Sequence, residues 1–168
     1  MTELKYEQGP STEAEILVAA EPAAVWPLVC DINLPARFST EFQGGDWLDG
    51  AAEPAAGCRF TGRNEHEAIG RWETVSTIVD FQRERLFAWV VGDPANPSAQ
   101  WRFELSAGEG GTVLRQSVRL GPGPSGLTPA IRSMPEKEDR IIRRRLAELN
   151  RNMASTIEGI KALAEERG

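Results

Sequence analysis

The sequence predicts an α+β fold in which a curved antiparallel sheet of about seven strands wraps around a long C-terminal α-helix. Between residues 41 and 120 apolar and polar residues alternate, which is the period of a half-buried strand. From about Pro135 to Glu166 apolar residues recur every three or four positions, which is the period of an amphipathic helix. The length fits one domain over residues 1–168, with residues 1–11 expected to form a flexible N-terminus.

The first 40 residues predict one strand followed by two short helices. The apolar run Glu13–Ala20 is typical of a strand. Pro22 suits the first turn of a helix over Ala23–Cys30, and Pro27 predicts a kink in that helix. A second break at Leu34-Pro35 leaves room for one more helical turn.

Turn-forming residues divide the alternating region into six further strands, and Gly44-Gly45 indicates a bulge or a close approach of two backbones. Strands joined by such short turns pair antiparallel, because a parallel pair needs a long crossover. The predicted strands are Phe42–Leu48, Cys58–His66, Arg71–Phe81, Arg85–Val91, Gln100–Ala107 and Thr112–Leu120. The following residues, 121–135, are expected to form a loop that is long enough to act as a flap.

The C-terminal helix carries a single apolar stripe, formed by Ile142, Leu146, Leu149, Met153, Thr156, Ile160 and Leu163. A helix of about 30 residues is roughly 45 Å long. The sheet is the only predicted surface that is broad enough to cover such a stripe. We therefore expect the sheet to curl around this helix.

The face of the sheet that points toward this helix mixes large aromatic residues with isolated small polar residues. A buried polar group without a partner costs about 1–3 kcal/mol, whereas water or a ligand can satisfy it in a cavity. The pattern therefore favours a ligand cavity, with a fully packed core as the alternative. The residues expected to line this cavity are Phe60, Asn64, His66, Trp72, Thr74, Trp89, Trp101, Phe103, Gln116 and Met153.

His66 is the best candidate for a catalytic residue. It is the only histidine, which excludes a metal site built from several imidazoles, and imidazole is the usual general acid or base at neutral pH. The alternative is a histidine near a strand end that solvent satisfies. Cys30 and Cys58 are expected to be reduced thiols, and the glycines of residues 121–126 lack the Lys-Ser/Thr of a phosphate-binding loop. No metal or cofactor is predicted.

Charge and hydropathy narrow the choice of partners. The formal net charge of −6 argues against nucleic acid, and no apolar run approaches the roughly 20 residues needed to span a bilayer. The N-terminus lacks the apolar core of a secretory signal, which predicts a cytoplasmic protein. Arg140 and Arg143–Arg145 alternate with acidic residues, as is typical of a solvated helix face. A monomer and a homodimer both stay open, since a free sheet edge can pair with another copy.

Four stretches of sequence carry a family resemblance: AEPAAVWPLVCDINLPARFSTEF (20–42), GCRFTGRN (57–64), RWETVSTIVDFQRERLFAWVV (71–91) and WRFEL…GGTVL (101–114). Together with the order of elements they resemble the START-like, Bet v 1-like helix-grip (SRPBCC) superfamily. The branch is the polyketide cyclase/dehydrase and lipid-transport type, and it looks actinobacterial. The resemblance covers about Ser11–Leu163. It implies a cavity between sheet and long helix, in a family whose members bind sterols, lipids, quinones, polyketides or plant hormones and only sometimes catalyse a reaction.

Three functions are consistent with these observations. The leading hypothesis is a binding or carrier protein for a small hydrophobic or amphipathic molecule, such as a lipid, a quinone or a polyketide-like compound. The second is an enzyme of the polyketide cyclase or dehydratase type. The third is a protein-interaction module with a vestigial cavity, which a closed interior without a pocket would favour. No functional residue transfers from the family by a motif match.

Overall fold

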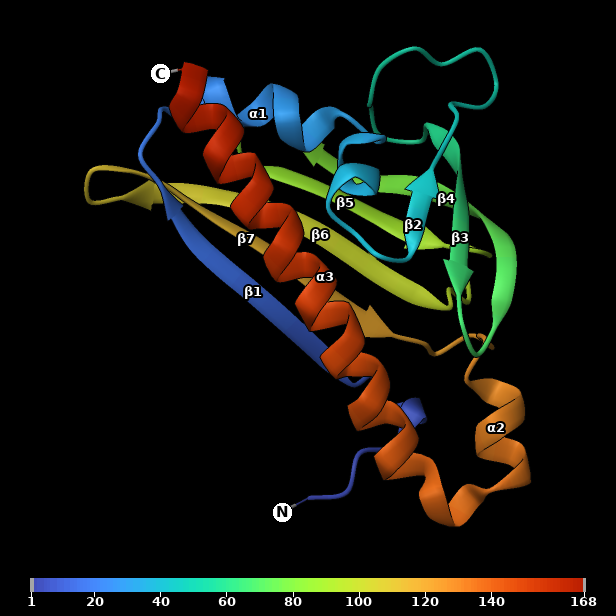
Figure 1. Ribbon diagram of the computed structural model, residues 1–168. Helices are drawn as coiled ribbons and strands as arrows, with labels where there is room; N and C mark the ends of the chain where they lie inside the picture. The colour runs from blue at the N-terminus through green and yellow to red at the C-terminus, as the bar shows by residue number, and fades with distance from the viewer. Residues whose placement is uncertain (1, 168) are drawn as a thin grey trace.

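The computed structural model describes residues 2–167 and shows one seven-stranded antiparallel sheet curled around a long helix (Figure 1). The strand order is β1-β7-β6-β5-β4-β3-β2, so the six later strands form a continuous meander and β1 lies beside β7. The strands are β1 (Ser11–Val18), β2 (Phe42–Gly44), β3 (Arg59–His66), β4 (Gly70–Gln82), β5 (Leu86–Val91), β6 (Ala99–Gly108) and β7 (Gly111–Leu120). The predicted α+β helix-grip architecture is confirmed.

The helical elements follow the predicted order. They are η1 (Tyr6–Gln8), α1 (Pro22–Cys30), η2 (Leu34–Arg37), α2 (Thr128–Ser133), η3 (Pro135–Lys137) and α3 (Glu138–Arg167). Pro22 occupies the first turn of α1, and the helix continues through Pro27. Within residues 2–167, no helix combines the length and the apolar character needed to cross a membrane.

Helix α3 lies diagonally across the concave side of the sheet, with its first turns beside α2 and its last turns beside α1 (Figure 1). Its apolar stripe is buried as the spacing predicts, with Ile142, Met153 and Ile160 at most 1% exposed. One cluster of buried side chains surrounds Ile157, Ile160 and Ala164 at the C-terminal end of the helix. A second cluster surrounds Ile142, Leu149 and Met153 toward its N-terminal end.

Side chains of α3 also satisfy the free edge of β1. The Nδ2 of Asn150 donates to the carbonyl of Glu13 at 2.9 Å, and the Nζ of Lys161 donates to the carbonyl of Leu17 at 2.9 Å. Just after the strand, the backbone N–H of Ala19 donates to Glu165 at 2.8 Å. The helix therefore takes the place of a neighbouring strand along this edge.

The second strand is shorter than the sequence predicts, since it ends at Gly44 instead of Leu48. Gly45 approaches the backbone of β3 so closely that a Cβ would lie 2.1 Å from the carbonyl oxygen of Thr61. The pairing of β2 with β3 shifts register between Phe42 and Gly44, and Trp47 makes only an isolated bridge with Phe60. The predicted bulge at the glycine pair is present, and it ends the strand.

Two further segments differ from the prediction. Residues 121–135, expected to be a loop, contain the short helix α2. Part of the N-terminus, expected to be flexible over residues 1–11, is hydrogen-bonded to the start of α3. The backbone N–H groups of Leu4 and Tyr6 donate to Asp139 at 2.6 Å and to Glu138 at 2.8 Å. Residues 4–8 thus have a defined place that the sequence did not lead us to expect.

Candidate ligand-binding cavity

A cavity of about 510 Å³ lies between the sheet and the middle of α3. Its walls come from β3 to β7, from α3 between Arg145 and Thr156, and from the segments that precede β2 and follow β7. Both clusters of buried side chains contribute to its wall, with Phe60 and Phe103 from the first and Leu149 and Met153 from the second. The volume is within the range of roughly 300–1,000 Å³ that is typical of small-molecule sites.

Strand alternation predicted part of the wall, and the helical stripe of α3 predicted Met153. The cavity is lined by Phe60, Asn64, Trp72, Thr74, Trp89, Trp101, Phe103, Gln116 and Met153, all of which were expected there. The register explains the agreement, because residues on one face of a strand share the same parity. The one register shift among β3 to β7 lies between Ile78 and Asp80 of β4, beyond the predicted wall residues of that strand.

His66 requires a correction, because it is absent from the cavity wall. It is the last residue of β3, where its side chain meets α3: Nε2 lies 3.1 Å from Oε2 of Glu148. Its Nδ1 accepts a hydrogen bond from the backbone N–H of Ala68 at 3.0 Å. In this geometry Nε2 carries the proton and donates to Glu148. Both ring nitrogens are therefore occupied, which counts against proton exchange between His66 and a cavity ligand.

His66 belongs to a cluster of four side chains, Glu41, Arg145, Glu148 and His66, which we call the charged cluster. Arg145 donates to both carboxylate oxygens of Glu41, at 2.6 and 2.7 Å, and to Glu148 at 3.3 Å. Arg145 and Glu41 also line the cavity, with side chains only 14% and 11% exposed. The cluster ties the end of β3 and the segment before β2 to the first half of α3.

Hydrogen bonds offset the effect of burial on the pKa of two groups of this cluster, Arg145 and Glu148. Burial lowers the pKa of Arg145, but its hydrogen bonds and ion pairs with Glu41 and Glu148 outweigh burial and raise that pKa above its ordinary value. Burial raises the pKa of Glu148, but hydrogen bonds from His66 and Arg145 hold it below its ordinary value. The sequence contained a signal for Arg145, since it lies three residues after Ile142 and four before Leu149, on the buried stripe of α3.

An aromatic cluster forms the apolar part of the wall. The cross-strand pair Trp89 and Trp101 stacks with ring centroids 6.0 Å apart and planes 4° apart. Trp89 also contacts Phe87 edge-on and Phe103 at a tilt, with centroids 5.3 and 5.8 Å away. Such clusters fix the position of each ring and provide a large apolar surface.

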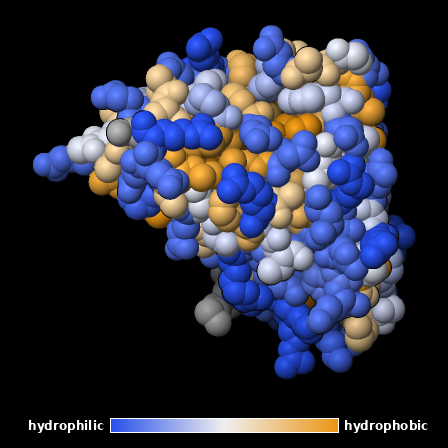
Figure 2. Space-filling view, turned by 45° about the horizontal axis from the view of Figure 1, so that its top comes forward, coloured by the Kyte–Doolittle hydropathy of each residue, from blue (hydrophilic) through white to orange (hydrophobic). Residues whose placement is uncertain are grey.

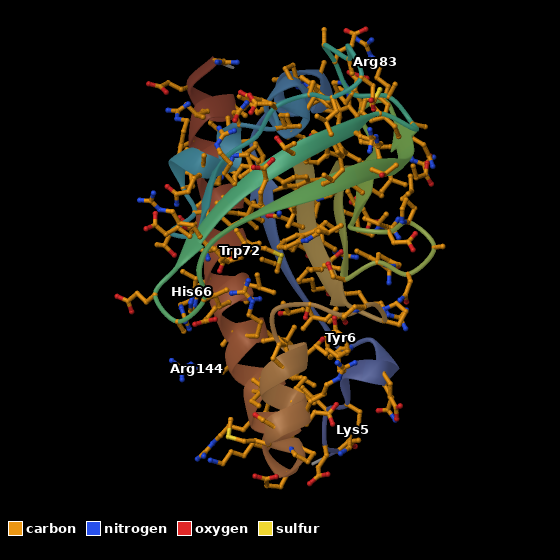
Figure 3. All side chains as sticks on the ribbon, turned by 90° about the vertical axis from the view of Figure 1, so that its right-hand side faces the viewer. Lys5, Tyr6, His66, Trp72, Arg83 and Arg144 are labelled. Carbon is orange, nitrogen blue, oxygen red and sulfur yellow. The ribbon has the colours of Figure 1, made fainter. Side chains whose placement is uncertain are left out.

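Two turns close the end of the cavity near the start of α3. Ile69, in the turn between β3 and β4, is 42% exposed and lines the cavity, as do residues 125–127 after β7. Figure 3 shows Trp72 and His66 at this end of the sheet, while Arg144 extends into solvent from α3. The role of residues 121–135 as a flap stays a prediction.

On the face that Figure 2 displays, hydrophobic atoms gather in the upper half of the view, where some hydrophilic side chains cross them, and hydrophilic atoms predominate toward the bottom. Among residues 2–167, no three His, Cys, Asp or Glu side chains are placed to hold a metal ion. The cavity is therefore the strongest candidate site in the described part of the chain.

A family model described as polyketide cyclase/dehydrase and lipid transport matches residues 10–155. The chain belongs to this family. Membership confirms the resemblance seen in the sequence, and it covers every element from β1 to the middle of α3. No curated protein sequence matches the chain.

Solved structures agree with this assignment. A polyketide-cyclase-like protein from Corynebacterium glutamicum is 28% identical, with a TM-score of 0.63 over 94% of this chain and 92% of that protein. The di-domain aromatase/cyclase StfQ of the steffimycin pathway is 15% identical, with a TM-score of 0.70 over 94% of this chain and 51% of StfQ. The chain thus spans about half of that protein. Ara h 8.0201 is 12% identical, with a TM-score of 0.55 over 94% of this chain and 96% of that protein. The last two show the fold alone.

Proposed function

We propose that this protein binds and carries a small hydrophobic or amphipathic molecule, such as a lipid, a quinone or a polyketide-like compound, in the cavity beneath α3. The observation that carries the proposal is a preformed cavity of about 510 Å³ with an aromatic wall. Membership of a family described by polyketide cyclisation and lipid transport supports the same class of ligand. A vestigial cavity is disfavoured, since that hypothesis called for a closed interior.

The cavity wall suits an apolar molecule with few polar groups. Its aromatic residues supply most of the apolar surface, and burial of that surface gains roughly 25 cal/mol per Å². Small polar side chains, among them Asn64, Thr74 and Gln116, interrupt the wall and can orient a polar group. Burial therefore supplies the affinity, and the few polar groups supply the orientation.

Mass spectrometry of small molecules extracted from the purified protein tests the proposal directly, together with a thermal-shift screen of lipids, quinones and polyketides. A ligand at about 100 times its dissociation constant adds roughly 2.7 kcal/mol, which raises the melting temperature of a protein of this size by several degrees. We expect one class of compound to co-purify or to give such a shift.

A substitution that narrows the cavity locates the binding site. Met153 is 1% exposed and lines the cavity from the middle of α3, so Met153→Trp places a larger ring in the ligand's space. We expect this variant to weaken binding at least tenfold, measured as the dissociation constant of the compound found in the screen. Met134→Trp is the matched control, because Met134 is 36% exposed and lies outside the wall. Equal affinity in both variants would contradict binding in the cavity.

An enzyme of the cyclase or dehydratase type is the second candidate, and the charged cluster is the observation that favours it. Glu41 and Arg145 bring a carboxylate and a guanidinium to the cavity wall, where they can contact a bound molecule. An enzyme would convert a linear poly-β-ketone thioester, and Glu41→Gln would abolish conversion while leaving binding largely intact. Chromatography and mass spectrometry measure conversion by the unaltered protein. If the compound binds but is not converted, the result favours a carrier protein.

A further inference from the structure

One hydrogen-bonding atom in the cavity wall has no partner. Gln116 lies on β7, where its nearest cross-strand neighbours are Phe103 on β6 and Ala14 on β1. The residue is only 5% exposed and lines the cavity. Within residues 2–167, its Oε1 is the only fully buried side-chain nitrogen or oxygen that makes no hydrogen bond.

Two other polar side chains of the wall, Thr156 and Asn152, are paired within the protein. The hydroxyl of Thr156 donates to the carbonyl of Asn152 at 2.9 Å. The side-chain oxygen of Asn152 accepts from the backbone N–H and the hydroxyl of Thr40, at 3.0 and 3.1 Å. These hydrogen bonds stabilise α3 and the segment before β2. The side-chain oxygen of Gln116 makes no such hydrogen bond.

The orphaned oxygen is costly for the protein alone, because a buried acceptor without a partner loses its hydration and gains nothing in return. The residues on either side of it along the inward face of β7, Leu114 and Val118, are apolar and at most 1% exposed. A leucine or methionine at position 116 would continue this pattern without that cost. The folded chain provides no hydrogen-bond partner for the oxygen of this glutamine, so a bound molecule that provides one would explain why a glutamine stands here.

The chemistry of the site identifies the kind of partner. A carboxamide oxygen only accepts hydrogen bonds, so the missing group is a donor. The neighbours of Gln116 on the sheet, Phe103 across from it and Val118 along β7, are apolar, which disfavours a cation because it would lose its hydration. A neutral hydroxyl or N–H group on an otherwise apolar molecule fits both conditions.

We propose that the cavity selects apolar ligands that carry a neutral hydroxyl or N–H group, which donates a hydrogen bond to Oε1 of Gln116. This inference rests on the proposed function and narrows its ligand class. Gln116 acts as a specificity-determining residue: it favours a phenol or an alcohol over the corresponding ether or hydrocarbon. A ligand without the donor leaves the oxygen unpaired and gains only the apolar contacts.

The test compares hydroxypyrene with methoxypyrene, in which a methyl group replaces the donor hydrogen of the same ring system. Their binding can be followed by quenching of the tryptophans in the wall. We expect the unaltered protein to bind hydroxypyrene about tenfold more tightly, the discrimination that one neutral hydrogen bond provides. In Gln116→Leu we expect hydroxypyrene to lose that advantage and methoxypyrene to bind at least as tightly as before.

The stability of the free protein gives an independent readout. Gln116→Leu removes the orphaned acceptor, so we expect its melting temperature to rise by about 2–4 °C without ligand. Asn152→Leu is the matched control, since it removes a polar side chain of the same wall whose oxygen is paired, and we expect its melting temperature to fall. If the branched side chain of leucine prevents folding, the same measurements are made on Gln116→Met.

The outcomes separate this inference from the proposed function. If neither pyrene binds the unaltered protein, the selection for a donor is overturned, and the proposed function is overturned too if the screen of lipids, quinones and polyketides also finds no ligand. If both pyrenes bind with equal affinity and Gln116→Leu changes neither affinity, the cavity is a binding site but the selection for a donor is refuted. A tenfold preference for hydroxypyrene that the leucine variant abolishes supports both.

Discussion

Gln116 and Arg145 are two polar residues of the same cavity wall, and they differ in whether the protein supplies hydrogen-bond partners for their side chains. The guanidinium of Arg145 is held by both oxygens of Glu41 and by Glu148, which compensates for its burial. The carboxamide oxygen of Gln116 has no such partner among the described residues. A fully paired polar residue is explained by the fold, whereas the fold provides no partner for an unpaired one, which is why we propose a ligand for Gln116.

Cys30 illustrates how burial alone changes reactivity. It lies at the end of α1, and burial raises the pKa of its thiol to about 12, against a smaller lowering by Arg83. Since the thiolate is the reactive form, we expect iodoacetamide at about pH 8 to label Cys30 roughly a thousandfold more slowly than an ordinary thiol. The rate should rise about tenfold per pH unit until the pH approaches that pKa.

Peptide mass spectrometry of labelled protein measures this rate for each cysteine separately. The same reaction in concentrated urea is the control, because unfolding exposes Cys30 and should restore ordinary labelling. Labelling of Cys30 in the folded protein as fast as in urea would show that the thiol is not protected.

The fate of individual residues shows how far the sequence predicts the site. The parity of a strand decides which side chains face inward, so Phe60, Thr74 and Gln116 could be assigned to the wall before the structure was known. His66 could not, because at the end of β3 its surroundings depend on Glu148 of α3, which is 82 residues away in the chain. The missing partner of Gln116 likewise depends on distances that no sequence pattern contains.

Among the elements, α3 combines three roles that its sequence suggests only in part. Its apolar stripe covers the sheet, its residues Asn150 and Lys161 satisfy the edge of β1, and Arg145 anchors the charged cluster. The stripe follows from periodicity and was predicted. The polar contacts pair residues more than 100 positions apart, and they were not.

Loss of the arginine should destabilise the charged cluster strongly. Arg145→Met leaves the buried carboxylate of Glu41 without its cation, and breaking such a pair costs about 3–5 kcal/mol. We expect a loss of this size in the free energy of unfolding, measured by urea denaturation. Arg144→Met is the control: this neighbour is exposed and makes no ion pair within residues 2–167, so its effect should stay within about 0.5 kcal/mol.

A double variant distinguishes loss of the pair from loss of packing. Glu41→Leu combined with Arg145→Met removes both charges, and we expect it to recover most of the stability. If the double variant is as unstable as Arg145→Met alone, the cost lies in packing and not in the unpaired carboxylate.

The elements that differ from the prediction do so because of contacts with distant segments. β2 is short because Gly45 meets the carbonyl of Thr61. The turn η1 is fixed by Glu138 and Asp139 at the start of α3. Local propensity describes a segment by itself, so such long-range restraints are outside its reach.

For the whole molecule, the two sheet edges bear on assembly. One edge is β1, whose carbonyls at Glu13 and Leu17 are taken by side chains of α3. The other is β2, which has only three residues. Short or covered edges are poor templates for pairing with another chain. Both features disfavour a dimer that extends the sheet.

We therefore expect a monomer in sedimentation velocity at micromolar concentration. Glu15→Pro is a diagnostic variant, because Glu15 shares the outward parity of Glu13 and Leu17 and its backbone N–H is not needed by β7. A dimer that Glu15→Pro dissociates would mean that the β1 edge is open to another chain after all.

On the inward face of β3, Gly62 borders the cavity and contributes no side chain to it. A Cβ at this position would meet Thr74 Oγ1 at 2.9 Å and the ring of Phe42 at 3.2 Å, both on side chains that can shift. The backbone there is ordinary extended strand, so folding does not demand a glycine. A change of one codon, from glycine to a residue with a side chain, would thus make the cavity smaller. Descendants of this gene can differ in this way in the size of the molecule they accept, while the surrounding fold stays the same.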